Sequence, residues 1–302
     1  MEVGFLGNAP VKSRTEGILL GSIGAIAFSG KAILVKLSYR YGVDAVTVIM
    51  LRMLFALPLF LGLSWWAARS KARLSPRDWV TVGGLGFCGY YLSSFLDFCG
   101  LQYIGASLER LVLYLNPTLV LVMSSLLFGV RITHHQWFSL AASYLGVLLV
   151  FGHDVSVNGA NVLLGSALVL VSAISYAVYL VSSGQVVRRL GALRITGLAT
   201  SIACLLCIAQ FLVLRPVSSL AFPAEVIWLS LLNATLCTFL PVLLVMLAIE
   251  RVGAPIVAQT SSIGPLSTIF LSIILLGEPF TLWLAAGTVL VLCGIWLLAR
   301  WR

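Results

Sequence analysis

The stretch "GASLERLVLYLNPTLVLVMSSLLFG", residues 105–129, has a second copy in "GAPIVAQTSSIGPLSTIFLSIILLG", residues 253–277. The opening Gly-Ala pair, the central Pro (Pro117 and Pro265) and the closing Gly match without a gap, at a constant offset of 148 residues. Self-similarity at one fixed offset is the signature of a repeated structural unit. We therefore treat the chain as two related halves.

The same offset also relates residues outside these two stretches. The further matches are Gly17 with Gly165, Leu20 with Leu168, Ala25 with Ala173, Ile26 with Ile174, Thr133 with Thr281 and Gly146 with Gly294. One offset thus serves almost the whole of each half.

The composition indicates an integral membrane protein. Of 302 residues, 60% are hydrophobic and only 10% are charged, which leaves too little polar surface for a soluble fold. Apolar runs of about 15 to 23 residues recur along the chain, each long enough for one helix to cross a hydrocarbon layer about 30 Å thick. They are too long and too uniformly apolar for β-barrel strands. The expected all-α fold has ten transmembrane helices, near 18–37, 45–66, 79–101, 107–128, 136–152, 162–183, 195–214, 226–248, 254–276 and 281–299.

Five helices per half make the second half enter the membrane from the side opposite to the first, so the repeats are inverted. Most Lys and Arg residues then fall on the side of the amino terminus, an asymmetry typical of cytoplasmic loops. This explains the net charge of +9 without nucleic acid. The expected organisation is a cytoplasmic tail (1–16), a first repeat (17–152), a connecting loop (153–161), a second repeat (162–299) and a cytoplasmic carboxyl end (300–302).

Inverted repeats are an architecture of secondary transporters, which hold substrate near the midplane between the halves. The two quoted stretches, the second continuing into "GEP", resemble the drug/metabolite transporter superfamily, and in particular its EamA-type exporters. Within it, the chain is similar to amino acid exporters of the YddG-like branch. It departs from the pattern at "GVR", residues 129–131, where "GE" is usual. The resemblance implies a central cavity and alternating access.

Polar and aromatic residues inside the spans are candidates for lining that cavity, because ionisable groups in hydrocarbon need a cavity, a partner or the interface. Phe28 and Lys31 lie on one helical stripe, and the second half has Tyr176 and Tyr179 at the equivalent positions. Lys31 could instead extend its ammonium group to the headgroups. The tyrosines could simply pack within the bundle.

Tyr90, Ser94 and Asp97 form a polar stripe on the third span. Asp97 could exchange protons, contact a substrate ammonium group, or pair with a cation such as Lys31 or Lys36. In the ninth span, Gln259 and Ser262 share a face just before Gly264 and Pro265.

Pro265 and its repeat partner Pro117 should kink their helices, Pro265 by releasing the carbonyl of Ser261. Alternatively, neighbouring hydroxyl groups hydrogen-bond to this carbonyl, and the segment binds no ligand. Asn116 is expected near the midplane. Glu109 and Arg110 are expected at the outer interface, where the carboxylate complements the positive helix end.

No metal or cofactor is expected. Cys204 and Cys207 lie among apolar neighbours and are interpreted as small hydrophobes, and His134 and His135 lie in a short turn. The ATP-binding sequence G-x-x-x-x-G-K-[ST] is absent from the sequence.

Transport is therefore facilitated or ion-coupled, with protons as a candidate ion. The prediction is a non-enzymatic exporter in the cell inner membrane that moves small metabolites, amino acids including aromatic ones. A multidrug effluxer and an integral membrane lipid-modifying enzyme are the alternatives.

Overall fold

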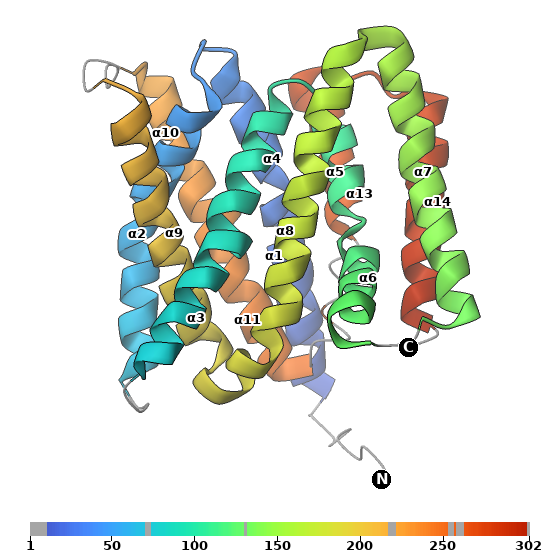
Figure 1. Cartoon of the computed structure of the whole chain (residues 1–302). Coiled ribbons are helices and arrows are strands. Elements are labelled where there is room, and N and C mark those ends of the chain that lie inside the picture. The colour runs from blue at the N-terminus through green and yellow to red at the C-terminus, as the bar shows by residue number, and fades with distance from the viewer. Residues whose placement is uncertain are drawn as a thin grey trace.

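The computed structural model describes residues 11–69, 74–129, 132–216, 222–252, 257 and 263–300, and this part of the chain contains helices and no strand (Figure 1). The first half contains α1 (Val11–Tyr39), α2 (Ala45–Ala68), α3 (Pro76–Gly86), η1 (Phe87–Leu92), α4 (Ser93–Leu101), α5 (Ala106–Leu113), α6 (Asn116–Phe128) and α7 (His134–Asn158). The second contains α8 (Ala160–Leu190), α9 (Ala192–Leu214), α10 (Ala224–Ala234), η3 (Thr235–Phe239), α11 (Leu240–Val252), α13 (Ile263–Leu271), η4 (Ser272–Leu276) and α14 (Leu282–Arg300).

The helices are long and apolar, as a membrane protein requires. Within the described residues, seven helical segments are long and apolar enough to cross a membrane, and the apolar helices Ile263–Leu276 and Leu282–Leu298 are shorter. The protein is thus a multi-pass membrane protein, while the count of ten spans stays a prediction.

Corresponding elements begin 148 residues apart. α3 begins at Pro76 and α10 at Ala224, while α7 begins at His134 and α14 at Leu282. Figure 1 shows that α1 and α8, which open the two halves, run in opposite directions through the molecule.

A π-helical turn interrupts the third helix of each half at equivalent positions, η1 from Phe87 and η3 from Thr235. A π turn admits one extra residue and frees backbone carbonyls that a neighbouring side chain must satisfy. The Ser175 hydroxyl of α8 donates to the carbonyl of Cys88 (2.7 Å), and the Thr238 hydroxyl donates to that of Asn233 (2.8 Å). The turns are therefore compatible with a membrane interior.

Several helix pairs lie close together because small residues line their contact. α7 packs against α14, where a Cβ atom added to Gly146 would lie 2.6 Å from the carbonyl oxygen of Gly287. α2 packs against α9, α1 against α11, and α8 against α4. Without a hydrophobic force between helices in lipid, such close backbone approach is a main source of association.

The end of α3 away from its π turn is fixed by a capping box between Ser75 and Asp78. Hydrogen bonds from the Ser75 backbone and hydroxyl, together with the Arg189 guanidinium, hold the pKa of the Asp78 carboxyl below its usual range. This arrangement connects the start of α3 to the end of α8.

Two segments that were expected outside the spans are helical at least in part. α1 already begins at Val11, inside the expected tail 1–16. The expected loop 153–161 is helical except around Gly159, whose φ of 76° only Gly adopts readily, so one residue separates α7 from α8. The expected span 107–128 corresponds to Ala106–Phe128, which is long and apolar enough to cross a membrane, and within it α5 and α6 are separated at residues 114–115, close to Pro117, where a kink was expected.

Candidate functional site

A cavity of about 400 Å³ lies between the two halves. Its walls come from α1, η1, α5, α6, α8, α9, α11, α13 and α14. The lining residues include Thr196 near the start of α9 and Ile295 near the end of α14, so the cavity extends toward the end of the molecule where both termini lie (Figure 1). Its volume is within the range of about 300–1,000 Å³ that small-molecule sites occupy.

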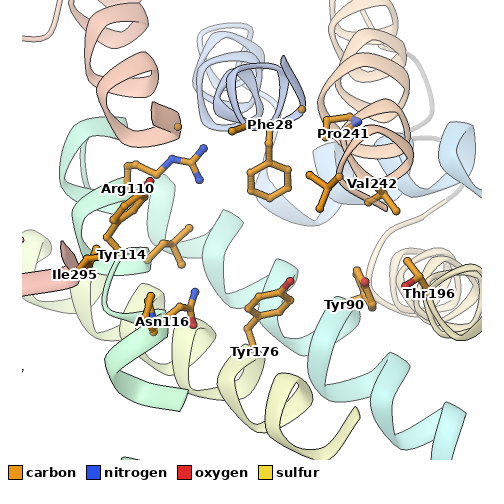
Figure 2. Close-up of a pocket in the computed structure, with 16 residues that line it drawn as sticks. Phe28, Tyr90, Arg110, Tyr114, Asn116, Tyr176, Thr196, Pro241, Val242 and Ile295 are labelled. Atoms are coloured by element: carbon orange, nitrogen blue, oxygen red, sulfur yellow. The ribbon is translucent and has the colours of Figure 1, made fainter. Parts of the chain in front are cut away.

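The two repeats contribute equivalent aromatic rings to this cavity. Phe28 of α1 and Tyr176 of α8 occupy matching repeat positions, and Figure 2 shows their rings on opposite walls. Tyr90 of η1 lies beside Tyr176, and Tyr114 also lines the cavity, next to Arg110. Tyr179 lies behind them, with its hydroxyl 3.3 Å from that of Tyr90 and its ring 5.5 Å from that of Tyr176. Tyr179 therefore supports the wall rather than forming it.

Other expected site residues divide between the cavity and its surroundings. Asn116, Pro117 and Gly264 line the cavity. Pro265 is buried in α13, next to Gly264, and Ser94 is half-buried on α4, outside the lining. Gln259, Ser262 and the expected kink at Ser261 lie outside the described residues.

Arg110 is the charged residue among those that line the cavity. Its guanidinium donates to the Thr268 hydroxyl (2.8 Å) and lies 5.3 Å from the centre of the Phe28 ring. Both contacts hold the guanidinium while leaving further N–H donors, because Arg has five. The cavity thus carries a positive end suited to a carboxylate.

Asn116 lies on the same side of the cavity as Arg110 (Figure 2). Its side-chain oxygen is buried, and no donor for it lies in the part of the chain that the structure describes. A buried acceptor without a hydrogen bond lowers the stability of the folded protein, and this oxygen can accept a hydrogen bond from a ligand.

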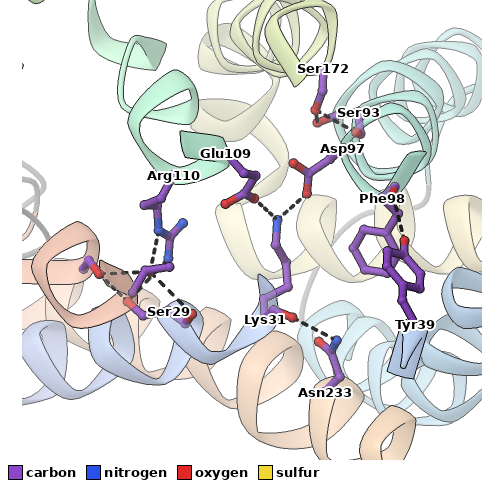
Figure 3. A network of polar contacts seen from close by, with 12 residues as sticks. Ser29, Lys31, Tyr39, Ser93, Asp97, Phe98, Glu109, Arg110, Ser172 and Asn233 are labelled. Carbon is purple, nitrogen blue, oxygen red and sulfur yellow. Dashed lines mark hydrogen bonds and ion pairs between the residues drawn. The ribbon is translucent and has the colours of Figure 1, made fainter. Parts of the chain in front are cut away.

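One interpretation of the sequence was that the Lys31 side chain extends to the membrane interface. The structure shows instead that this side chain is buried. Its ammonium group lies 2.6 Å from Asp97 Oδ2 and 3.6 Å from Glu109 Oε1 (Figure 3). On α1, Lys31 follows the cavity residue Phe28 in the direction away from the termini. The expected pairing of Asp97 with Lys31 is thereby realised, and Glu109 joins it.

Beyond this ion cluster, contacts between the halves close the molecule. The Glu278 carboxylate accepts from the amides of Ala106 (2.6 Å) and Ser107 (3.1 Å), at the start of α5. The Ser107 hydroxyl also donates to it (2.6 Å). A carboxylate at a helix amino end is favoured by the free amides and the helix dipole. Lys36 donates to the carbonyls of Leu101 and Ile104 on the same side.

Comparison with known proteins identifies the family. The model of the EamA-like transporter family matches residues 15–152 and, separately, residues 163–300. The chain belongs to the EamA-like transporter family. It is accordingly a transporter and not an enzyme, which removes the lipid-modifying alternative.

Relatives of this EamA-like chain are also described as transporters. The uncharacterized transporter YcbK of Bacillus subtilis (strain 168) is 28% identical over 279 residues, covering 89% of this chain and 88% of its own. An uncharacterized transporter of Archaeoglobus fulgidus is 26% identical over 76% of this chain and 81% of its own. A solved crystal structure aligns with 95% of this chain and 98% of its own, with a TM-score of 0.62 and 17% identity, which supports the fold alone.

The sequence interpretation did not predict that Arg110 lines the cavity of this EamA-like protein, or that Glu109 belongs to the buried ion cluster next to it. It placed them at the outer interface, because they stand in the first turns of a span. The start of α5 is instead buried between α1 and α13, beneath the Glu278 contact, so Glu109 is fully buried and Arg110 reaches the cavity. Their signal was the charge itself, within an apolar segment.

Proposed function

We propose that the protein is a secondary transporter that exports small metabolites, namely amino acids including aromatic ones, by alternating access. The observation that carries this proposal is a cavity with aromatic rings from both repeats and the Arg110 guanidinium at one end. A zwitterion with an apolar side chain has the complementary chemistry.

The residues suggest how such a substrate would lie. Its carboxylate would bind the free donors of Arg110, because charge-assisted pairs with guanidinium are among the stronger hydrogen bonds. Its ammonium group would donate to the unpaired oxygen of Asn116. Its side chain would lie between Phe28, Tyr90 and Tyr176.

We place both termini in the cytoplasm and the protein in the cytoplasmic membrane, so the present conformation would be the inward-facing one. Substrate would enter the cavity from the side of the termini. The halves would then rock about the interruption before Pro117 and the region of Gly264 and Pro265, exposing the cavity to the other side.

Counterflow in proteoliposomes tests the substrate class. Vesicles loaded with one unlabelled amino acid should accumulate the labelled form, fastest for aromatic and large apolar side chains. Movement of cationic dyes with no movement of any amino acid would favour the multidrug alternative and overturn this proposal.

Arg110 supplies a sharper test. Arg110→Gln should raise the KM for amino acids about 10- to 100-fold, since a hydrogen bond to a charged group contributes about 1.5–3 kcal/mol. Arg110→Lys should recover part of the loss. The matched control is Arg215→Gln, which removes an exposed guanidinium paired with Asp44 and should leave the KM unchanged. Equal KM values for Arg110→Gln and wild type would contradict the pose.

A further inference from the structure

The buried ion cluster of Lys31, Asp97 and Glu109 joins three helices, α1, α4 and α5 (Figure 3). The exposed fractions of the three side chains are 9%, 2% and 0%. Water therefore hardly solvates their charges, and the opposite charges within the cluster must compensate one another.

That balance is unequal, because two carboxyl groups share one ammonium group. Lys31 lies nearest Asp97, and this pair compensates itself. Glu109 is left with a longer contact to Lys31, at 3.6 Å, and this is the salt bridge recorded for Glu109 within the described part of the chain.

The neighbouring helices offer Glu109 little further compensation. Arg110 follows it on α5, but the Arg110 guanidinium is directed to Thr268 of α13, Ser29 of α1 and the Phe28 ring. Arg52 of α2 stacks on the Phe98 ring at 4.9 Å, beyond Asp97. The titratable groups of α8 near the cavity are the phenols Tyr176 and Tyr179, and α7 contributes Tyr144.

The hydrogen bonds of the cluster also indicate that the negative charge on its carboxyl groups is incompletely compensated. Both oxygens of Glu109 and the Oδ1 atom of Asp97 are buried, and none of them accepts a hydrogen bond from the described residues. An ionised carboxylate left in this state costs several kcal/mol, whereas a proton both removes the surplus charge and supplies a donor. The Asp97 carboxyl faces Glu109 across Lys31, so an acceptor is available (Figure 3).

We infer that Glu109 binds one exchangeable proton in this conformation, and that Lys31 and Asp97 form a fixed pair that positions it. The inference deepens the proposed function, because this proton would be the ion that couples amino acid export to a pH gradient. A proton from the outer solution would convert the Glu109 carboxylate to the neutral acid when the outer side is open. Loss of that proton to the inner solution would restore the carboxylate and favour reopening.

Infrared difference spectroscopy tests the proton site without any substrate. Purified protein at neutral pH should show the carbonyl stretch of a protonated carboxylic acid, and Glu109→Gln should abolish it. Asp97→Asn should abolish it too, because Glu109 then becomes the only partner of Lys31. The matched control Glu225→Gln, at an exposed carboxyl group on α10, should leave the band unchanged. A band that persists in Glu109→Gln would overturn the inference.

Transport measurements then separate coupling from substrate recognition. Glu109→Gln should retain amino acid counterflow but lose the stimulation of export by an inward proton gradient. Export that still responds to the gradient would overturn the inference. Absence of counterflow in wild type would overturn the proposed substrate class instead, and the infrared result would still decide the proton site.

Discussion

At the scale of single residues, the ion cluster explains why charged side chains remain in so apolar a chain. The positive charge of Lys31 compensates the negative charge of Asp97, and the contact of Lys31 with Glu109 adds a residue of α5 to the cluster. Removing the cation leaves buried carboxyl groups uncompensated, which is a recognised cause of large losses of stability.

Lys31→Met should therefore destabilise the folded protein by about 3–5 kcal/mol. The double variant Lys31→Met/Asp97→Asn should recover much of this loss, because the remaining carboxyl group of Glu109 can stay protonated. Thermal unfolding in detergent measures both. A single variant as stable as wild type would show that Lys31 does not compensate these carboxyl groups.

The sequence predicted part of this site. Helical spacing and the repeat placed Phe28, Tyr176 and Tyr179 around a common space, although Tyr179 lies behind its wall. The sequence also offered Lys31 as a partner of Asp97. It could not place Glu109, because burial of a first-turn carboxyl group depends on which other helices cover the start of α5. That information lies in long-range packing and not in local pattern.

At the scale of the helices, the offset of 148 residues predicted which elements correspond. The π turns were not predicted, whereas α5 and α6 are separated next to Pro117, where the sequence analysis expected a kink. A π turn has no distinct residue signature, because the extra residue changes the helical register without changing composition. In the contact of α7 with α14, small residues allow the two helix backbones to approach closely.

Gly146→Ala should destabilise the protein by about 1–3 kcal/mol, as overpacking in a tight contact does. The added methyl group would meet a backbone oxygen of α14, which cannot rotate away. Gly152→Ala, on the same helix but with nothing within 4 Å of the added atom, is the matched control and should be neutral or slightly stabilising. Equal unfolding temperatures for the two variants would contradict the close approach of α7 and α14.

At the scale of the whole molecule, the two halves repeat the fold but do not repeat the contact that closes the side away from the termini. Glu278 holds the second half to the start of α5, while its repeat equivalent in the first half is Val130. The carboxylate stabilises closure on the side away from the termini. Which side is closed could not be predicted from the sequence, because both halves carry the same helix pattern.

Glu278→Gln should shift the protein toward the conformation open on that side, since it weakens charge-assisted hydrogen bonds to the start of α5. Ser272→Cys provides a reporter, because Ser272 is fully buried beside Ser107. A membrane-impermeant maleimide should label this cysteine several-fold faster in the Glu278→Gln background. The same background without the reporter gives the contribution of the native cysteines. Unchanged labelling would show that other contacts hold this side closed.

The matched π turns η1 and η3 also bear on how the protein arose. The offset of 148 residues holds before and after them, so neither half gained or lost a residue relative to the other at this point. One insertion in an ancestral five-helix unit, copied when the gene for that unit duplicated, accounts for both. On this account the π turn is older than the duplication that produced the two halves.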